Sequence, residues 1–289
     1  EVCLQGGIHP KFSGETYLDI VRAIRSVSDS IHIHAFSPLE IDHGRKTLNI
    51  SVKDFLIELK NVGLNSLPGT AAEILHDDIR AIICPDKLNS NEWVEIIKAA
   101  HSVGLPTTST MMFGHVENMS HVAHHLIRLL EIQNSTNGLT EFVPLPFVAE
   151  EAPIFRRGKS RPGPTFKETI LVHSVARILY NGSINNIQGS WVKMGLPGLK
   201  YLLSSGINDI GGVLMNESIT RSAGASFGQE LNLDDVLSII DELGLNLKQR
   251  NTLYHSLTND IQDLINLQSI PLIPIINEYH QPKKITTTV

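Results

Sequence analysis

The sequence predicts an α/β fold in which parallel strands alternate with helices and form a TIM-type barrel. Two observations support this fold class. Short apolar segments alternate with amphipathic helical segments through the first three quarters of the chain, which is typical of a parallel sheet with helices outside it. Loops rich in glycine and polar residues follow the apolar segments, as they do at the active-site end of such a barrel.

Strands are expected in order along the chain at 2–5, 31–36, 64–67, 106–112, 139–144, 184–188 and 209–214. A closed barrel of this type has eight strands, whereas this sequence offers seven and begins with a strand rather than with an initiator Met. We therefore expect a barrel over residues 1–254 that lacks its first βα unit. Residues 255–289 are expected to form a C-terminal helix and tail that pack on the barrel as an appendage.

Helices are expected between the strands, where apolar residues recur three or four positions apart. The segment 16–27 shows this spacing, and so does 93–103, for which Ser90 or Asn91 is a suitable N-cap. A third helix is expected over 119–132. The histidines of HVAHH at 121–125 lie on it; we expect them to face solvent and assign them no role.

The composition disfavours several function classes. A net charge of −6 argues against nucleic-acid binding, because phosphate binding needs a basic surface. No apolar run approaches the roughly 20 residues of a membrane span, and no signal-peptide pattern opens the sequence, so a cytoplasmic protein is expected. Cys3 and Cys84 stand in apolar surroundings, which indicates buried, reduced thiols and leaves a disulfide open.

Several residues that follow the expected strands suit ligand binding. Gly6 and Gly7 let a ligand approach the backbone closely, or they simply form a tight turn. Glu73 and Glu117 each follow a glycine by three or four residues. Such a carboxylate accepts hydrogen bonds from ribose hydroxyls or an amino group, or it sits in a first helical turn because the helix dipole favours it there.

Two histidines open a different possibility. His32 and His34 alternate on one strand and so face the same side of the sheet. With His115 and Asp209 they suit a metal-dependent barrel hydrolase. The alternative is that the histidines form hydrogen bonds within the barrel.

Taken together, the motifs resemble a known family. They are CLQGGIHP, IHIHAFSPLEI, LPGTAAEIL, PTTSTMMFGHVE, TEFVPLPF, NIQGSWVKMG, NDIGGVLMNESITRSAGA and KQRNTLY. Their order and spacing over residues 1–254 resemble the radical S-adenosylmethionine enzymes, and among them the 5-amino-6-(D-ribitylamino)uracil–L-tyrosine 4-hydroxyphenyl transferases. The futalosine enzymes of menaquinone synthesis share several of these motifs, whereas GTAAE, EFVPL and SWVK look more like the transferases.

The resemblance implies a [4Fe-4S] cluster held by a CxxxCxxC motif, and S-adenosylmethionine as the radical source. The motif is absent here, so its cysteines are expected upstream of Glu1 and this fragment alone is expected to be inactive. The implied reaction moves the 4-hydroxybenzyl group of L-tyrosine to 5-amino-6-(D-ribitylamino)uracil and releases 2-iminoacetate, methionine and 5′-deoxyadenosine. This step belongs to synthesis of the deazaflavin FO, whose second activity is the implied functional partner. A non-catalytic binding module remains a further alternative.

The resemblance also places site residues, although it assigns no catalytic residue and no metal ligand in this chain. Residues expected near S-adenosylmethionine are Gln5, Gly6, Gly7, Ser37, Thr70, Glu73 and Glu117. Residues expected near tyrosine, uracil or ribityl groups are His34, His115, Gln188, Ser190, Lys193 and Arg221.

Overall fold

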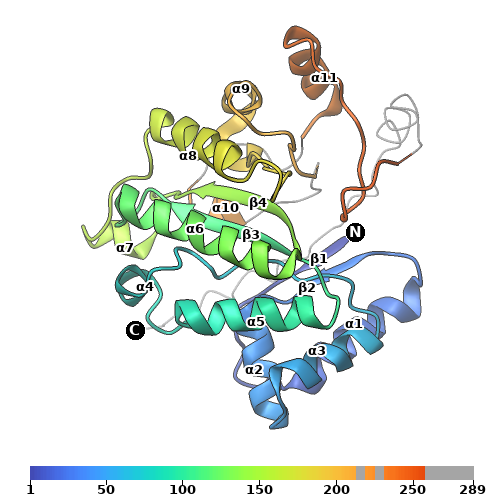
Figure 1. Ribbon diagram of the computed structural model, residues 1–289. Helices are drawn as coiled ribbons and strands as arrows, with labels where there is room; N and C mark the ends of the chain where they lie inside the picture. Colours follow the sequence, from blue (N-terminus) through green and yellow to red (C-terminus); the bar gives the residue numbers. More distant parts are fainter. Residues whose placement is uncertain (213–218, 225–230, 258–289) are drawn as a thin grey trace, which may run out of the picture.

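The computed structural model describes residues 1–212, 219–224 and 231–257, and its strands run parallel in the order of the sequence (Figure 1). β1 (Val2–Leu4) pairs with β2 (Ile33–Ala35), and β3 (Thr107–Phe113) pairs with β4 (Leu139–Pro146). Single parallel bridges extend this ladder. They join His34 to Ser66, Leu67 to Thr107, Phe142 to Ile187 and Gln188 to Asp209. Each expected strand therefore contributes at least one pairing at its expected place.

Helices connect these strands and lie outside them. They are α1 (Gly14–Val27), α2 (Pro38–Leu48), α3 (Val52–Asn61), α4 (Asp77–Ile83), α5 (Ser90–Ser102), α6 (Met119–Thr136), α7 (Pro153–Arg156), α8 (Phe166–Leu179), α9 (Trp191–Leu203), α10 (Ile219–Ser222) and α11 (Leu233–Glu242). Figure 1 shows α1, α2 and α3 beside the β1–β2 pair, and α6 and α8 beside β3 and β4.

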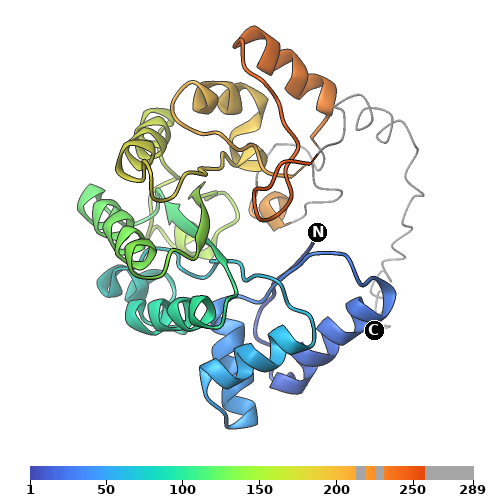
Figure 2. The ribbon, with the colours of Figure 1, turned by 45° about the vertical axis from the view of Figure 1, so that its right-hand side comes forward.

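The strands form an incomplete ring rather than a closed barrel. Figure 2 shows the helices around the outside of this ring, with the N-terminal strand facing the segment that follows α11. Within the described residues no strand pairing joins Asp209 to β1. The side chain of Thr252 instead donates a hydrogen bond to Glu1. The α/β class and parallel order are confirmed, and the expected appendage beyond residue 257 lies outside the described residues.

The apolar core lies between the strands and the helices, in two clusters. One cluster joins α1, α2, α3 and α5 to β1 and β2, with Tyr17, Ile33 and Phe55 among its buried members. The other joins α5, α6, α8, α9 and α11 to β3 and β4, and it includes Trp93 and Phe142. Because alternate strand residues enter these clusters, the remaining ones point into the ring.

Three local expectations are corrected by the structure. The N-cap of α5 is Asn89, whose Oδ1 accepts from the N–H of Glu92 at 2.9 Å, because Glu92 at N3 completes a capping box. His125 is fully buried rather than solvent-facing. Both cysteines are free, but Cys84 is buried whereas Cys3 is exposed. Cys3 alternates with Val2 and Leu4, which pack outward, so it faces the open interior of the ring.

No helix among the described residues has the length and apolar character needed to cross a membrane.

Candidate functional site

The ring encloses mostly polar side chains. His32 and His34 alternate with Ile33, which packs outward, and Glu141 precedes Phe142, which also packs outward. These histidines and Glu141 therefore point toward the interior. A lumen of this kind suits a polar ligand, because each buried polar group there needs a hydrogen-bond partner.

His34 on β2 and His32, which directly precedes that strand, form hydrogen bonds inside the ring. His32 Nε2 and His34 Nδ1 each lie 2.7 Å from Ser66 Oγ. Desolvation lowers the pKa of His34 to about 4, so its imidazole is neutral at pH 7. Asp209 is paired with Arg250 instead. The contacts of His32 and His34 are those of the hydrogen-bonded alternative, and among the described residues no three His, Cys, Asp or Glu side chains converge on a possible metal position.

The loop after β1 is anchored by Glu40, a residue that the sequence analysis did not single out. Its carboxylate accepts from Gly6 N at 3.1 Å, from Ser37 N at 2.8 Å and from Ser37 Oγ at 2.7 Å. Desolvation raises the pKa of Glu40. Gln5 and Gly7 are exposed, and a Cβ at Gly7 would meet no atom within 4 Å. The signal for Glu40 was its spacing from Ser37, which is that of a capping box.

The loop 69–75, which carries the GTAAE motif, is held by partners from several elements. Gly69 N donates to Thr108 Oγ1 at 2.9 Å, and Thr110 Oγ1 donates to Gly69 O at 2.7 Å. Trp93 Nε1 donates to the carbonyl of residue 70 at 3.0 Å. The buried guanidinium of Arg80 donates to the carbonyls of residues 71 and 72. The loop is therefore rigidly placed.

Within this loop Thr70 stands apart. Its Oγ1 is buried and has no hydrogen-bond partner among the described residues. The backbone around it is strained, because Ala71 and Glu73 have φ values of 58° and 48° in the left-handed region. Glu73 Oε1 pairs with Lys87 Nζ at 2.6 Å. A strained, rigid loop with an unpaired buried hydroxyl is the arrangement expected of a ligand contact.

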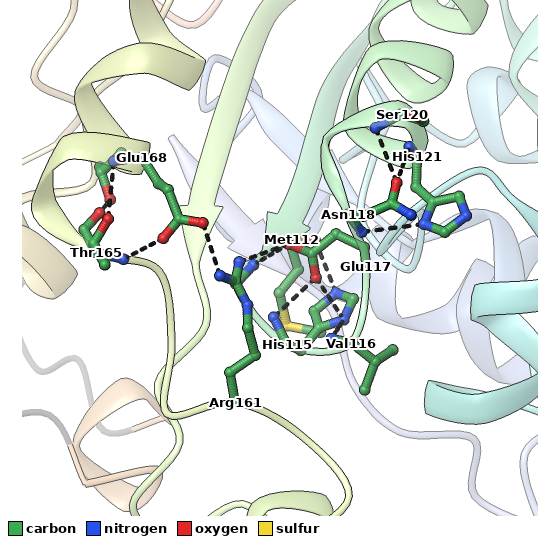
Figure 3. Close-up of polar contacts among 12 residues, drawn as sticks. Met112, His115, Val116, Glu117, Asn118, Ser120, His121, Arg161, Thr165 and Glu168 are labelled. Atoms are coloured by element: carbon green, nitrogen blue, oxygen red, sulfur yellow. Dashed lines mark hydrogen bonds and ion pairs between the residues drawn. The ribbon is translucent and has the colours of Figure 1, made fainter.

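The carboxylate of Glu117 holds the loop after β3 (Figure 3). Glu117 Oε1 accepts from Gly114 N at 2.6 Å and from Arg161 at 3.3 Å, and Oε2 accepts from His115 N at 2.9 Å. Arg161 also reaches Glu168 Oε1 at 2.7 Å, at the start of α8. Glu117 is fully buried, so its oxygens serve the loop itself.

His115 is also occupied within this loop. Its Nδ1 accepts from Val116 N at 2.8 Å, and its Nε2 donates to Met112 O at 3.0 Å. Desolvation lowers the pKa of His115, and its Nδ1 also lies 3.0 Å from Glu117 Oε2. In this conformation both ring nitrogens are used by the backbone.

We expect Glu117→Gln to lower the free energy of unfolding by about 2 kcal/mol, since a charged acceptor of backbone N–H groups is replaced by an amide that also places a donor there. The matched control is Glu168→Gln, which changes the partly exposed second partner of Arg161 and should cost less than about 1 kcal/mol. Urea denaturation at pH 7 measures both. Equal effects would contradict the assigned role of Glu117.

A second polar network lies deeper in the ring. Tyr254 donates to Glu141 Oε2, Gln188 Nε2 donates to the same oxygen at 3.2 Å, and Arg250 Nε pairs with Asp209 Oδ2 at 2.5 Å. The guanidinium of Arg250 also lies 4.0 Å over the ring of Tyr254. Desolvation raises the pKa of Glu141 to about 7. Glu141 was not among the expected site residues, although it lies in the motif TEFVPLPF and its partners Arg250 and Tyr254 lie in KQRNTLY.

The remaining expected site residues lie near α9 and α10. Ser190 is the buried N-cap residue of α9. Lys193 lines an open cavity of about 310 Å³ between the end of β4 and the starts of α8 and α9. The other lining residues are Pro146, Phe147, Val148, Glu150, Pro162, Gly163, Pro164, Phe166, Thr169, Met194 and Gly224. Arg221 belongs to α10, but its side chain lies outside the described part of the chain.

The structure thus brings the expected residues together in groups rather than in one shell. Gly6 and Ser37 share the Glu40 carboxylate. Thr70 and Glu73 belong to one rigid loop, and His115 and Glu117 to another. His34 faces Ser66, whereas Gln188 faces the Glu141 network.

Comparison with known proteins adds relatives of known name. A family profile described as "CofH/MqnC C-terminal region" matches residues 136–262. The chain is 48% identical over 257 residues to the 5-amino-6-(D-ribitylamino)uracil–L-tyrosine 4-hydroxyphenyl transferase of Methanocaldococcus jannaschii, covering 88% of this chain and 72% of that protein. A transferase of the same name from Methanothermobacter thermautotrophicus is 46% identical, with coverages of 89% and 70%.

Two further matches are a longer protein, of which this chain covers a part, and a solved structure of low sequence identity. FO synthase of Mycobacterium tuberculosis is 44% identical over 254 residues, which are 88% of this chain and 30% of that protein. The crystal structure of methylornithine synthase superposes with a TM-score of 0.63 at 14% identity, covering 86% of this chain and 68% of the other. At that identity the likeness supports the fold alone.

Proposed function

The chain belongs to the family of 5-amino-6-(D-ribitylamino)uracil–L-tyrosine 4-hydroxyphenyl transferases, and from this we propose that it carries the substrate site for that transfer. The proposed reaction moves the 4-hydroxybenzyl group of L-tyrosine to the aminouracil, in synthesis of the deazaflavin FO. The observation that carries the proposal is 48% identity over 88% of the chain. The family profile also covers MqnC, which keeps a futalosine-pathway enzyme as the second candidate.

S-adenosylmethionine fits the residues at the rim of the ring. Thr70 Oγ1 is a buried hydroxyl that lacks a partner among the described residues, and additional atoms at Gly6 and Gly7 would meet none within 4 Å. The Gly6–Gly7 backbone, Thr70 and Glu73 would hold its amino and ribose groups. When bound, S-adenosylmethionine supplies the 5′-deoxyadenosyl radical that abstracts hydrogen from the substrate.

The iron–sulfur cluster does not fit the cysteines of this chain. Three thiolates hold such a cluster in radical enzymes of this kind, and the sequence contains Cys3 and Cys84 alone. Although Cys3 is accessible from the interior of the ring, the protein around it desolvates its thiol and, with the nearby carboxylates of Glu1 and Glu141, raises its pKa to about 11, which disfavours a thiolate. We propose a [4Fe-4S] cluster as a cofactor of the reaction, with neither Cys3 nor Cys84 among its ligands.

In the proposed reaction the chain binds and orients the substrate. The neutral His34 and its partner Ser66 offer hydrogen bonds without a charge, and such contacts hold the substrate in position beside the radical source. The cavity beside Lys193, which Phe147, Phe166 and Met194 help to line, has the size and apolar character suited to an aromatic amino acid. We assign tyrosine to it.

The proposed product requires further chemistry. The FO synthase of Mycobacterium tuberculosis is about three times longer than the region matched here, since this chain covers 30% of that protein. We propose that the second FO synthase activity consumes the product, as a separate or a fused protein.

The experiment that tests the function uses this chain as part of an enzyme that supplies the three cluster cysteines, reconstituted anaerobically with a [4Fe-4S] cluster and given S-adenosylmethionine, L-tyrosine and the aminouracil. We expect 5′-deoxyadenosine and the hydroxybenzyl adduct to form together. The variant Thr70→Val should weaken S-adenosylmethionine binding about tenfold, because it removes the hydroxyl proposed to contact this ligand. Thr70→Ser is the matched control that keeps the hydroxyl. Because the Val variant removes an unpaired buried hydroxyl, the free energy of unfolding should not fall. Adduct formation that needs no tyrosine, or binding without cleavage, would contradict the proposal.

A further inference from the structure

Two consecutive histidines of helix α6, His124 and His125, contact the same residue, Leu75, at the end of the loop 69–75. Leu75 N donates to His125 Nδ1 at 2.9 Å, and His124 Nδ1 lies 3.1 Å from Leu75 O. Leu75 ends the loop 69–75 that carries Thr70 and Glu73. Both backbone groups at the end of this loop are therefore held by side chains from an element about 50 positions away.

The two imidazoles must adopt opposite tautomers to make these contacts. His125 Nδ1 accepts a hydrogen bond from Leu75 N, so the ring proton of His125 is on Nε2, whereas His124 donates from Nδ1. His125 is fully buried, and desolvation lowers its pKa to about 3. It therefore stays neutral and remains an acceptor over the working pH range.

Another buried histidine shows that packing alone does not require such a contact. His173 on α8 is also fully buried, but its Nδ1 bonds to the carbonyl of Thr169 in its own helix at 2.7 Å. His125 Nδ1 instead accepts a hydrogen bond from Leu75 N, in the loop 69–75. If the acceptor were removed, the N–H of the buried residue Leu75 would lose this partner, which a folded protein avoids.

The contact completes the series of backbone anchors along the loop. Side chains from α4, α5 and β3 hold residues 69–72, and Met112 N donates to Glu73 O at 2.8 Å. His125 secures the end that these partners do not reach. The strained conformations at Ala71 and Glu73 need such support on both sides, because a freed loop would relax them.

We propose that His125, assisted by His124, is a positioning residue that fixes the loop 69–75 so that Thr70 and Glu73 meet the ligand. The inference rests on the proposed function for the identity of the ligand, S-adenosylmethionine, and on geometry alone for the fixing of the loop. The histidine touches no reacting atom and acts through Leu75.

The test compares His125→Leu, which removes the acceptor at similar volume, with His125→Asn, whose Oδ1 can replace Nδ1. His173→Leu is the control for the loss of a buried histidine. Amide hydrogen exchange of the peptide covering 69–75 measures loop order without any cofactor. Equilibrium binding of S-adenosylmethionine to the reconstituted enzyme measures the consequence for the site.

We expect His125→Leu to speed exchange of this peptide at least tenfold and to weaken binding at least tenfold, with His125→Asn within threefold of the wild type. His173→Leu should change neither. If His125→Leu does not fold, the same comparison is made with His124→Leu and His124→Asn, where the exposed side chain makes the change milder. Unchanged amide exchange in the Leu variants, or equal changes in the His173→Leu control, would overturn the proposal. An enzyme that shows the exchange effect but binds no S-adenosylmethionine would instead refute the proposed function.

Discussion

The fold is expected to lose stability steeply between pH 7 and pH 5, because buried neutral histidines take up protons when the chain unfolds. Desolvation lowers the pKa of His34, His101 and His173 to about 4 and that of His125 to about 3. All four are thus neutral in the folded state at pH 5, whereas in the unfolded chain their pKa is near 6.5.

The direction of the change in the free energy of unfolding with pH follows from proton uptake by the unfolded chain. Between the folded and unfolded pKa values the unfolded chain binds more protons, so the free energy of unfolding rises with pH and is lost as the pH falls below about 6.5. Each histidine costs about 2 kcal/mol at pH 5. Glu141 acts in the opposite direction, since its raised pKa of about 7 lets the folded state take up a proton first. The net loss is about 5 kcal/mol, a large part of the stability of a typical domain.

Urea denaturation at several pH values from 8 to 5 measures this loss. The variant His173→Leu removes one of the four groups without touching the candidate site, so its stability should fall less steeply with decreasing pH, by roughly a quarter of the histidine contribution. A free energy of unfolding that is constant from pH 7 to pH 5 would show that these histidines are not buried as neutral groups.

The sequence predicted the order of the elements well, because strand and helix periodicities are local. Each expected strand contributes pairing near its expected place, and the helix at 16–27 begins two residues earlier, at Gly14. The predicted N-cap of α5, Ser90 or Asn91, was wrong because several cap-forming residues are adjacent there, and the structure uses Asn89. Barrel closure was beyond local patterns, since it depends on which distant segments meet.

The site was predicted less completely, because partners distant in sequence decide what a polar side chain does. Glu117 was expected to contact a ligand, yet its oxygens accept from Gly114, His115 and Arg161. The first two partners lie within three residues and were open to local reasoning, whereas Arg161 was not. Glu141 was missed for the same reason, because its partner Tyr254 is 113 positions away.

The glycines after β1 and in the loop 69–75 differ in the space around them. Atoms added at Gly6 and Gly7, which were expected to let a ligand approach the backbone, meet nothing within 4 Å. A Cβ at Gly69 would lie 2.0 Å from Thr108 O and 2.8 Å from the Cα of Ser109. These are backbone atoms of β3, so no side-chain rotation can relieve the contact.

We therefore expect Gly69→Ala to lower the free energy of unfolding by about 3 kcal/mol or more, at the upper end for overpacking, because the loop must move away from β3. That movement also breaks the bonds of Gly69 to Thr108 and Thr110 and displaces the neighbouring Thr70. Gly7→Ala is the matched control and should stay within about 0.5 kcal/mol of the wild type. Urea denaturation gives both values, and S-adenosylmethionine binding should weaken in the Gly69 variant beyond what its lost stability explains. If Gly69→Ala were as stable as Gly7→Ala, the loop 69–75 would not be packed against β3, and the preorganisation on which Thr70 depends would be absent.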